Sequence, residues 1–184
     1  MRFTVTYPHP PERVWAALTE REALEAWLMP NDFLPVVGHR FTFRTSPAPG
    51  FDGIVNCEVL EVDLLHRLSF SWRGGPIDTT VTFTLEAVQN GTRLTLEQVG
   101  FAGVTARTVG WMLGQGWRRM SRESLPQVLD RIGAGLPLTL KRESTEDDGP
   151  TTRMRASMWI TSRVIQVFGR KTAINASERH DENE

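Results

Sequence analysis

The sequence is poor in the residues that build disulfides and metal sites. It has 184 residues, with one cysteine and four histidines. A single cysteine, Cys57, excludes an internal disulfide and cannot by itself hold zinc. The histidines (His9, His39, His66 and His180) have no metal-ligand spacing to one another or to Cys57. We therefore expect neither a metal nor a cofactor.

Several signatures of common protein classes are also missing. There is no nucleophile elbow, no GxxxxGK[ST] phosphate loop and no GxGxxG after a strand. A formal net charge of −1 gives no general basic character for binding nucleic acid. No apolar run approaches membrane-spanning length, and the start, MRFTVTYPHP, lacks the apolar centre of a signal peptide. We expect a cytoplasmic protein with no nucleic-acid partner and no membrane contact.

The most strongly patterned stretch is 114–133, which predicts an amphipathic helix. Its apolar residues recur at steps of three and four: Trp117, Met120, Leu125, Val128, Leu129 and Ile132. Ser121 and Ser124 fall near the middle of the apolar arc. Small hydroxyls suit a helix that covers a space; alternatively, each bonds back to a carbonyl of its own helix. Pro126 predicts a kink that frees the carbonyl of Arg122.

The N-terminal region predicts a strand followed by two short helices. Residues 2–7 alternate apolar and polar side chains, as in a strand. Pro10 and Pro11 suit the first turn of a helix, where a missing N–H costs nothing. Thr19 and Glu22 have the spacing of a capping box for a second helix, which Pro30 ends.

From residue 38 to 101 the apolar pattern has period two, which indicates an antiparallel meander. Five stretches alternate in this way, around 40–44, 55–59, 68–72, 80–86 and 93–97. Asn90-Gly91 predicts a tight hairpin between the last two. Residues 103–116 then predict a glycine-spaced loop or a short helix leading to the long helix.

Two strands change phase, and each change predicts a β-bulge or a strand end covered on both faces. Leu60 and Val62 are out of step with Val59, and Val99 is out of step with Leu96. Among the acids Glu58, Asp78 and Glu97, simple alternation puts Glu58 and Glu97 on the wet face. A bulge near Gln98 that turned Glu97 inward would make Glu97 a buried carboxylate and a candidate general base.

The apolar faces are rich in aromatic residues, which fits a mostly apolar ligand pocket; a fully packed core explains them equally well. On the pocket interpretation, Cys57 is a structural thiol on the apolar face rather than a reactive one. The candidate ligand-binding residues are Trp27, Phe43, Cys57, Phe70, Trp72, Phe83, Gln98, Trp117, Ser121 and Ser124.

The C-terminal part differs in character from the rest. We expect one domain over 1–135 and a polar linker over 136–152. Residues 153–172 predict a basic amphipathic helix, with five basic and no acidic side chains between Arg153 and Lys171. Such a helix could dock on its own domain or a second copy, which we favour, on a protein partner, or on an anionic membrane. Residues 173–184 predict a disordered acidic terminus.

The order of elements resembles the helix-grip fold of the START-like (SRPBCC) superfamily. The motifs are most similar to the branch named for the Hsp90 ATPase activator (AHSA1-like). The resemblance rests on these motifs: PPERVWAALT at 10–19, AWLMP at 26–30, GHRFTF at 38–43, RLSFSW at 67–72, GTRLTL at 91–96 and Gly116-Trp117. Leu28 stands where the family commonly has a second tryptophan after Trp27.

The resemblance implies an α+β domain whose curved antiparallel sheet wraps around a long C-terminal helix, with a cavity between them. It implies no shared catalytic motif. We expect a carrier or sensor of a small hydrophobic molecule; the alternatives are a co-chaperone-like interaction module and a cyclase- or hydrolase-type enzyme using Glu97.

Overall fold

The structure is a computed structural model that describes residues 1–47, 51–75, 77–102 and 106–138. The predicted tail helix (153–172), the acidic terminus (173–184) and most of the predicted linker lie outside these residues. The described elements are β1 (Arg2–Tyr7), α1 (Pro11–Thr19), α2 (Arg21–Trp27), β2 (Arg40–Arg44), β3 (Ile54–Asp63), β4 (Arg67–Gly74), β5 (Ile77–Val88), β6 (Gly91–Val99), α3 (Ala106–Arg119), the π-helical turn η1 (Met120–Ser124) and α4 (Leu125–Gly133).

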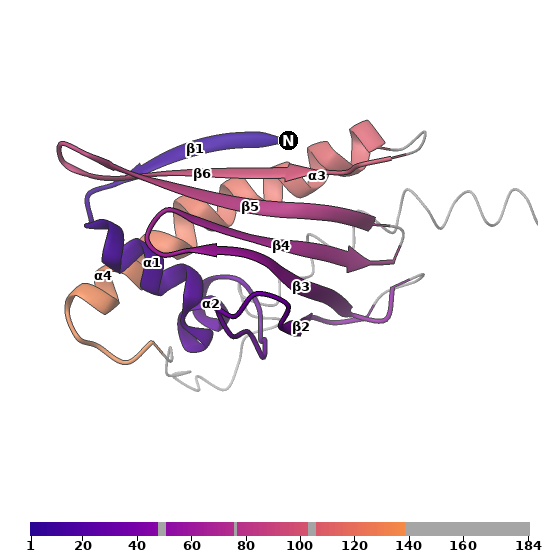
Figure 1. Ribbon diagram of the computed structural model, residues 1–184, viewed down its shortest axis with the longest axis horizontal. Coiled ribbons are helices and arrows are strands. Elements are labelled where there is room, and N and C mark those ends of the chain that lie inside the picture. Colours follow the sequence, from indigo (N-terminus) through magenta and orange to yellow (C-terminus); the bar gives the residue numbers. More distant parts are fainter. Residues whose placement is uncertain (48–50, 76, 103–105, 139–184) are drawn as a thin grey trace, which may run out of the picture.

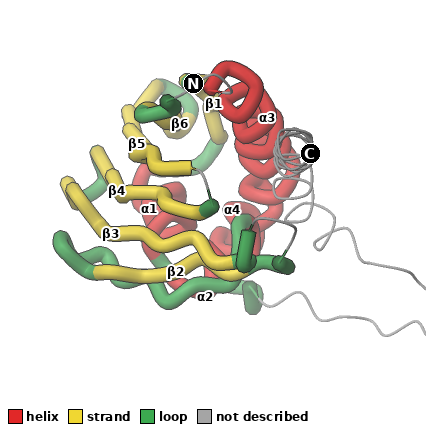
Figure 2. Tube along the Cα trace, turned by 90° about the vertical axis from the view of Figure 1, so that its right-hand side faces the viewer, coloured by secondary structure: helices red, strands yellow, loops and turns green. Residues whose placement is uncertain are grey.

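The strands form one antiparallel sheet, as the period-two pattern predicts. Its order is β1-β6-β5-β4-β3-β2, so each strand from β2 to β6 lies beside its neighbour in sequence and β1 is added at the β6 edge. The sheet curves, and α3 and α4 lie on the inner side of the curve (Figure 1, Figure 2). The alternating apolar side chains of β2–β6 face this helix and are buried. The helix-grip fold expected from the sequence is confirmed.

One of the two predicted bulges is present. Between β3 and β4 the register shifts at Val59/Glu61, so Leu60 is the extra residue. Two residues earlier, the backbone N–H of Glu58 donates to Ser71 Oγ at 2.9 Å. The bulge predicted near Gln98 is absent. β5 and β6 keep one register from Thr80↔Val99 to Val88↔Gly91, and Val99 is simply half exposed.

The predicted hairpin between β5 and β6 forms. Its two central turn residues are one position earlier in the chain than the predicted Asn90-Gly91. The strands end and begin at Val88 and Gly91, which pair with each other, so Gln89 and Asn90 make the connection. Gly91 itself has φ +142°, a conformation that only glycine adopts without strain.

The two short helices close one end of the curved sheet (Figure 1), and α1 lies against α4. The predicted capping box at Thr19 and Glu22 is wrong. Thr19 is the last residue of α1, where its hydroxyl donates to Trp15 O at 2.8 Å, and Glu20 is the N-cap of α2 with no side-chain cap. The helix break is therefore made by the extended backbone of Glu20 rather than by a cap.

The long helix begins eight residues before the predicted start. Residues 106–113, expected to be a loop or short helix, form the first part of α3. Glycine spacing obscured this, because Gly110, Gly114 and Gly116 weaken the helix signal. Among the described residues, no helix is long and apolar enough to cross a membrane.

Candidate functional site

The inner side of the sheet carries a connected set of aromatic rings that meets the long helix at Trp117. The Trp117 ring centroid lies 5.4 Å from that of Trp72, 5.9 Å from that of Phe83 and 6.3 Å from that of Trp27. Phe43 extends the set, at 5.4 Å from Trp72. These rings are almost completely buried, so one aromatic wall joins α2, the sheet and α3.

The candidate residues chosen from the sequence come together on this inner side. All are buried except Ser124, which is only partly buried. Phe70 lies between Phe43 and Phe83, at 6.1 and 6.0 Å between ring centroids. Cys57 follows on β3, paired with Phe41. In the structure the rings touch one another, so the aromatic residues form packed walls.

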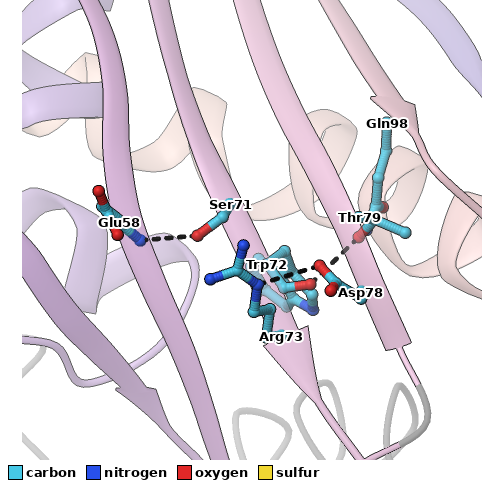
Figure 3. Close-up of polar contacts among 7 residues, drawn as sticks. All are labelled: Glu58, Ser71, Trp72, Arg73, Asp78, Thr79 and Gln98. Atoms are coloured by element: carbon cyan, nitrogen blue, oxygen red, sulfur yellow. Dashed lines mark hydrogen bonds and ion pairs between the residues drawn. The ribbon is translucent and has the colours of Figure 1, made fainter. Parts of the chain in front are cut away.

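A chain of hydrogen bonds crosses the interior beside these rings. Trp117 Nε1 donates to Gln98 Oε1 at 3.0 Å, and Gln98 Nε2 donates to Thr79 Oγ1 at 2.8 Å. Thr79 Oγ1 in turn donates to the carbonyl of Trp72 at 3.3 Å. Figure 3 shows Gln98, Thr79 and Trp72 in sequence across β6, β5 and β4. Gln98 was predicted to face a ligand. In the structure, its Oε1 and its Nε2 each form a hydrogen bond within the protein.

The long helix changes its hydrogen-bonding pattern directly after this network. The N–H of Leu125 bonds to Met120 O, five residues back, instead of to Ser121 O. Pro126 has no backbone N–H, so it cannot donate to the Ser121 carbonyl in place of Leu125. The freed Ser121 carbonyl accepts a hydrogen bond from Tyr7 Oη at 2.6 Å. The sequence predicted a kink that frees the carbonyl of Arg122; the structure instead has a π turn, in which the carbonyl of Ser121 is the one that bonds to β1.

Ser121 differs from the other buried polar side chains of the interior. It is 1% exposed, and its Oγ has no hydrogen-bond partner. Of the fully buried side-chain nitrogen and oxygen atoms in the described residues, only Thr45 Oγ1 shares this condition. A buried hydroxyl without a hydrogen-bond partner lowers the stability of the fold, so its presence calls for an explanation. Back-bonding to its own helix, the alternative raised by the sequence, does not occur at Ser121.

The interior does not favour charge. Burial raises the pKa of the Cys57 thiol well above its ordinary value, so Cys57 stays a neutral, structural thiol. Burial also raises the pKa of Tyr7, despite the hydrogen bond to Ser121. Leaving aside residues 103–109, no arginine, aspartate or glutamate of the described residues is buried. None of the residues of the aromatic wall or of its hydrogen-bond chain carries a cationic side chain.

The candidate acids lie away from the interior. Because the bulge near Gln98 is absent, Glu97 stays on the outer face, paired with Thr82 and Arg2 in the neighbouring strands. Asp78 accepts a hydrogen bond from Arg73 Nε at 3.1 Å, as Figure 3 shows. The geometry on which Glu97 would be a general base is not present.

The candidate ligand-binding residues chosen from the sequence leave out four interior residues, Phe41, Thr79, Phe33 and Tyr7. Phe41 and Thr79 have the same strand parity as Phe43 and Val81, so alternation already marked them as inward. Phe33 lies in a loop and packs on Phe41 at 5.0 Å between ring centroids, and Tyr7 reaches the helix from the end of β1. No periodic signal reports these two contacts.

Comparison with protein families decides the relationship. The family model described as Activator of Hsp90 ATPase homolog 1-like protein matches residues 8–130. The chain belongs to this AHSA1-like family. The match begins directly after β1, covers the two short helices, the meander and the long helix, and ends within α4. No curated protein is similar enough to match the sequence.

Solved structures agree with the AHSA1-like assignment. Protein MLL2253 from Mesorhizobium loti is 38% identical, with a TM-score of 0.62, over 71% of this chain and 98% of that one. Protein BH1534 from Bacillus halodurans is 29% identical, with a TM-score of 0.58, over 70% and 94%. The Aha1 dimer from Colwellia psychrerythraea shares the fold at 19% identity, with a TM-score of 0.58, over 73% and 96%.

Proposed function

We propose that this AHSA1-like chain is a cytoplasmic carrier or sensor of a small hydrophobic molecule, bound between the curved sheet and the long helix. The observation that carries the proposal is the π turn at Met120–Ser124. A π turn is less stable than the regular helix and is found frequently at functional sites. Here it lies on the helix that faces the aromatic wall, one turn after Trp117.

The aromatic residues supply the apolar surface that such a molecule needs. Trp27, Trp72 and Trp117 form the part of the wall nearest the helix, and they come from three separate elements. Because the rings touch in the structure, at least one of them turns aside when a molecule enters. Binding therefore changes the environment of buried tryptophans and is expected to shift their fluorescence emission.

The direct test is mass spectrometry of freshly purified protein under native and denaturing conditions. We expect a reproducible excess mass in the native spectrum that is lost on denaturation and is recovered by apolar extraction. Replacing Ser121 with tryptophan (Ser121→Trp) is expected to remove at least nine-tenths of this excess, because an indole at the π turn would occupy the volume that the bound molecule needs there.

Two controls separate blocked binding from damage to the fold. Gln127→Trp places the same side chain at an exposed position of α4 and should keep the excess mass. Ser121→Leu fills less volume, in case the tryptophan variant melts without cooperativity. A bare wild-type chain, or full binding by a cooperatively melting Ser121→Trp protein, would contradict the proposal.

A second candidate function is an interaction with an Hsp90-type chaperone, favoured by the family's description. One structural feature adds to it. The loop after α2 exposes three apolar side chains, Leu34, Val36 and Val37, each more than half exposed. The loop is held at its base, where the carboxylate of Asp32 accepts the backbone N–H of Thr42 at 2.6 Å. This hydrogen bond lowers the pKa of Asp32.

The ATPase rate of an Hsp90-type chaperone, measured with and without the full chain, tests this candidate. If it is right, the chain raises the rate, and the double substitution Val36→Asp, Val37→Asp removes at least half of the increase. The exposed Leu64→Asp variant is the matched control, since Leu64 is equally apolar and lies in the β3–β4 turn. An unchanged ATPase rate would count against a chaperone role.

A further inference from the structure

The interior described above has one unused hydrogen-bonding group, the hydroxyl of Ser121. Other polar groups near the aromatic wall have partners inside the protein. Trp27 Nε1 donates to Ala17 O at 2.8 Å, and the Gln98 amide is engaged at both ends. The Ser121 Oγ has none, although it is almost fully buried.

The unmet hydroxyl lies within the π turn. The backbone around Ser121 is fixed by two bonds that bypass the side chain: Leu125 N–H to Met120 O, and Tyr7 Oη to Ser121 O. In a regular helix a serine hydroxyl often bonds back to a carbonyl in the preceding turn. Here it does not, and it stays available to an incoming group.

We infer that the bound molecule is uncharged and carries one hydrogen-bonding oxygen, a ketone or a hydroxyl, which pairs with the Ser121 Oγ while its apolar body lies against the aromatic wall. This inference rests on the proposed binding function and specifies its ligand class. An oxygen that accepts from the Ser121 hydroxyl satisfies a buried donor that otherwise costs free energy.

The charge of the molecule follows from what surrounds the site. A carboxylate needs a buried cation or several donors to offset its desolvation. Leaving aside residues 103–109, no arginine of the described residues is buried, and the buried His9 is already engaged by Arg13 and Asp130. One hydroxyl supplies a single donor. Burial already raises the pKa of Cys57 and of Tyr7, so the interior favours the neutral forms of acids.

Three probes with the same bicyclic skeleton test the inference by calorimetry: 2-acetylnaphthalene (a ketone), 2-ethylnaphthalene (apolar) and 2-naphthoate (a carboxylate). We expect the full-length protein to bind the ketone at least about fivefold more tightly than the hydrocarbon, the value of one buried hydrogen bond. The carboxylate should bind at least about tenfold more weakly than the ketone.

The Ser121→Ala variant separates the role of the hydroxyl from that of the wall. It should bind the hydrocarbon as the wild type does but lose the preference for the ketone. Its melting temperature should stay equal or rise, because an unpaired buried hydroxyl has been removed. Ser69→Ala, which removes a buried hydroxyl from the outer face of the sheet, should keep the preference.

The outcomes distinguish a wrong ligand class from a wrong binding function. A ketone preference that survives in Ser121→Ala, or equal binding of all three probes by the wild type, would overturn the ligand class alone. A clear fall in the melting temperature of Ser121→Ala would do the same, since it would show that the hydroxyl is already satisfied. No binding of any probe, with a bare chain in native mass spectra, would overturn the binding function itself.

Discussion

Replacing Gly91 with alanine is expected to lower the free energy of unfolding by at least about 3 kcal/mol, which corresponds to a fall in melting temperature of about 10 °C or more. Two causes add. Gly91 has φ +142°, where a side chain is strained. A Cβ there would also overlap the carbonyl oxygen of Tyr7 and lie 3.0 Å from the Cα of Pro8. Both contacts are to backbone, which cannot turn aside as a side chain does.

Gly38→Ala is the matched control. Gly38 also has positive φ, +83°, but a Cβ added there meets nothing within 4 Å. Gly38→Ala should therefore lower the free energy of unfolding only by the cost of the positive φ, about 1–2 kcal/mol. Thermal melts of the two variants beside the wild type give the comparison. Equal losses would show that the approach of Gly91 to β1 carries no weight and that backbone conformation alone decides both.

Gly91 also shows how far local sequence reasoning reaches. Asn90-Gly91 marked the hairpin correctly, because turn chemistry is local. The contact of Gly91 with Tyr7 joins residues far apart in the chain, and no pattern in either segment reports it. The same holds for β1 as a whole: alternation predicted the strand, whereas its place beside β6 follows from packing.

In the candidate site, too, some placements follow from local sequence and others depend on tertiary contacts. Alternation placed Phe43, Phe70 and Phe83 on one inner face, and helical spacing placed Trp117 and Ser121 opposite them. Each placement depends on periodicity, which the backbone enforces. The helix geometry at Ser121 was predicted only in part. Pro126 predicted an irregularity, but the π turn and its hydrogen bond to Tyr7 depend on a tertiary partner.

Gln98 and Glu97 show where periodicity misleads. The phase change at Val99 indicated a bulge, yet Val99 is half exposed and the register continues. An exposed apolar residue at a strand end imitates a bulge in sequence. The consequence matters chemically, because a bulge would have brought Glu97 inside, whereas continuous alternation brings Gln98 inside and leaves Glu97 outside.

Gln98→Leu is expected to destabilise the protein by about 2–3 kcal/mol, although leucine is apolar and of similar size. Gln98 is fully buried, and its Oε1 is the acceptor for Trp117 Nε1. Leucine leaves that indole N–H buried without an acceptor, and it removes the donor to Thr79 Oγ1. Urea denaturation of the variant beside the wild type measures the loss.

A double-mutant cycle with Trp117→Phe tests the cause. Phenylalanine has no N–H, so once it replaces Trp117 the loss of Gln98 Oε1 no longer strands a donor. The Gln98→Leu substitution should then cost at least about 1 kcal/mol less than it does in the wild type. Additive losses would mean that Gln98 acts through its shape alone. A positive coupling would identify Gln98 as the polar tie between β6 and the long helix, which holds Trp117 at the aromatic wall and leaves Ser121 as the free hydroxyl beside it.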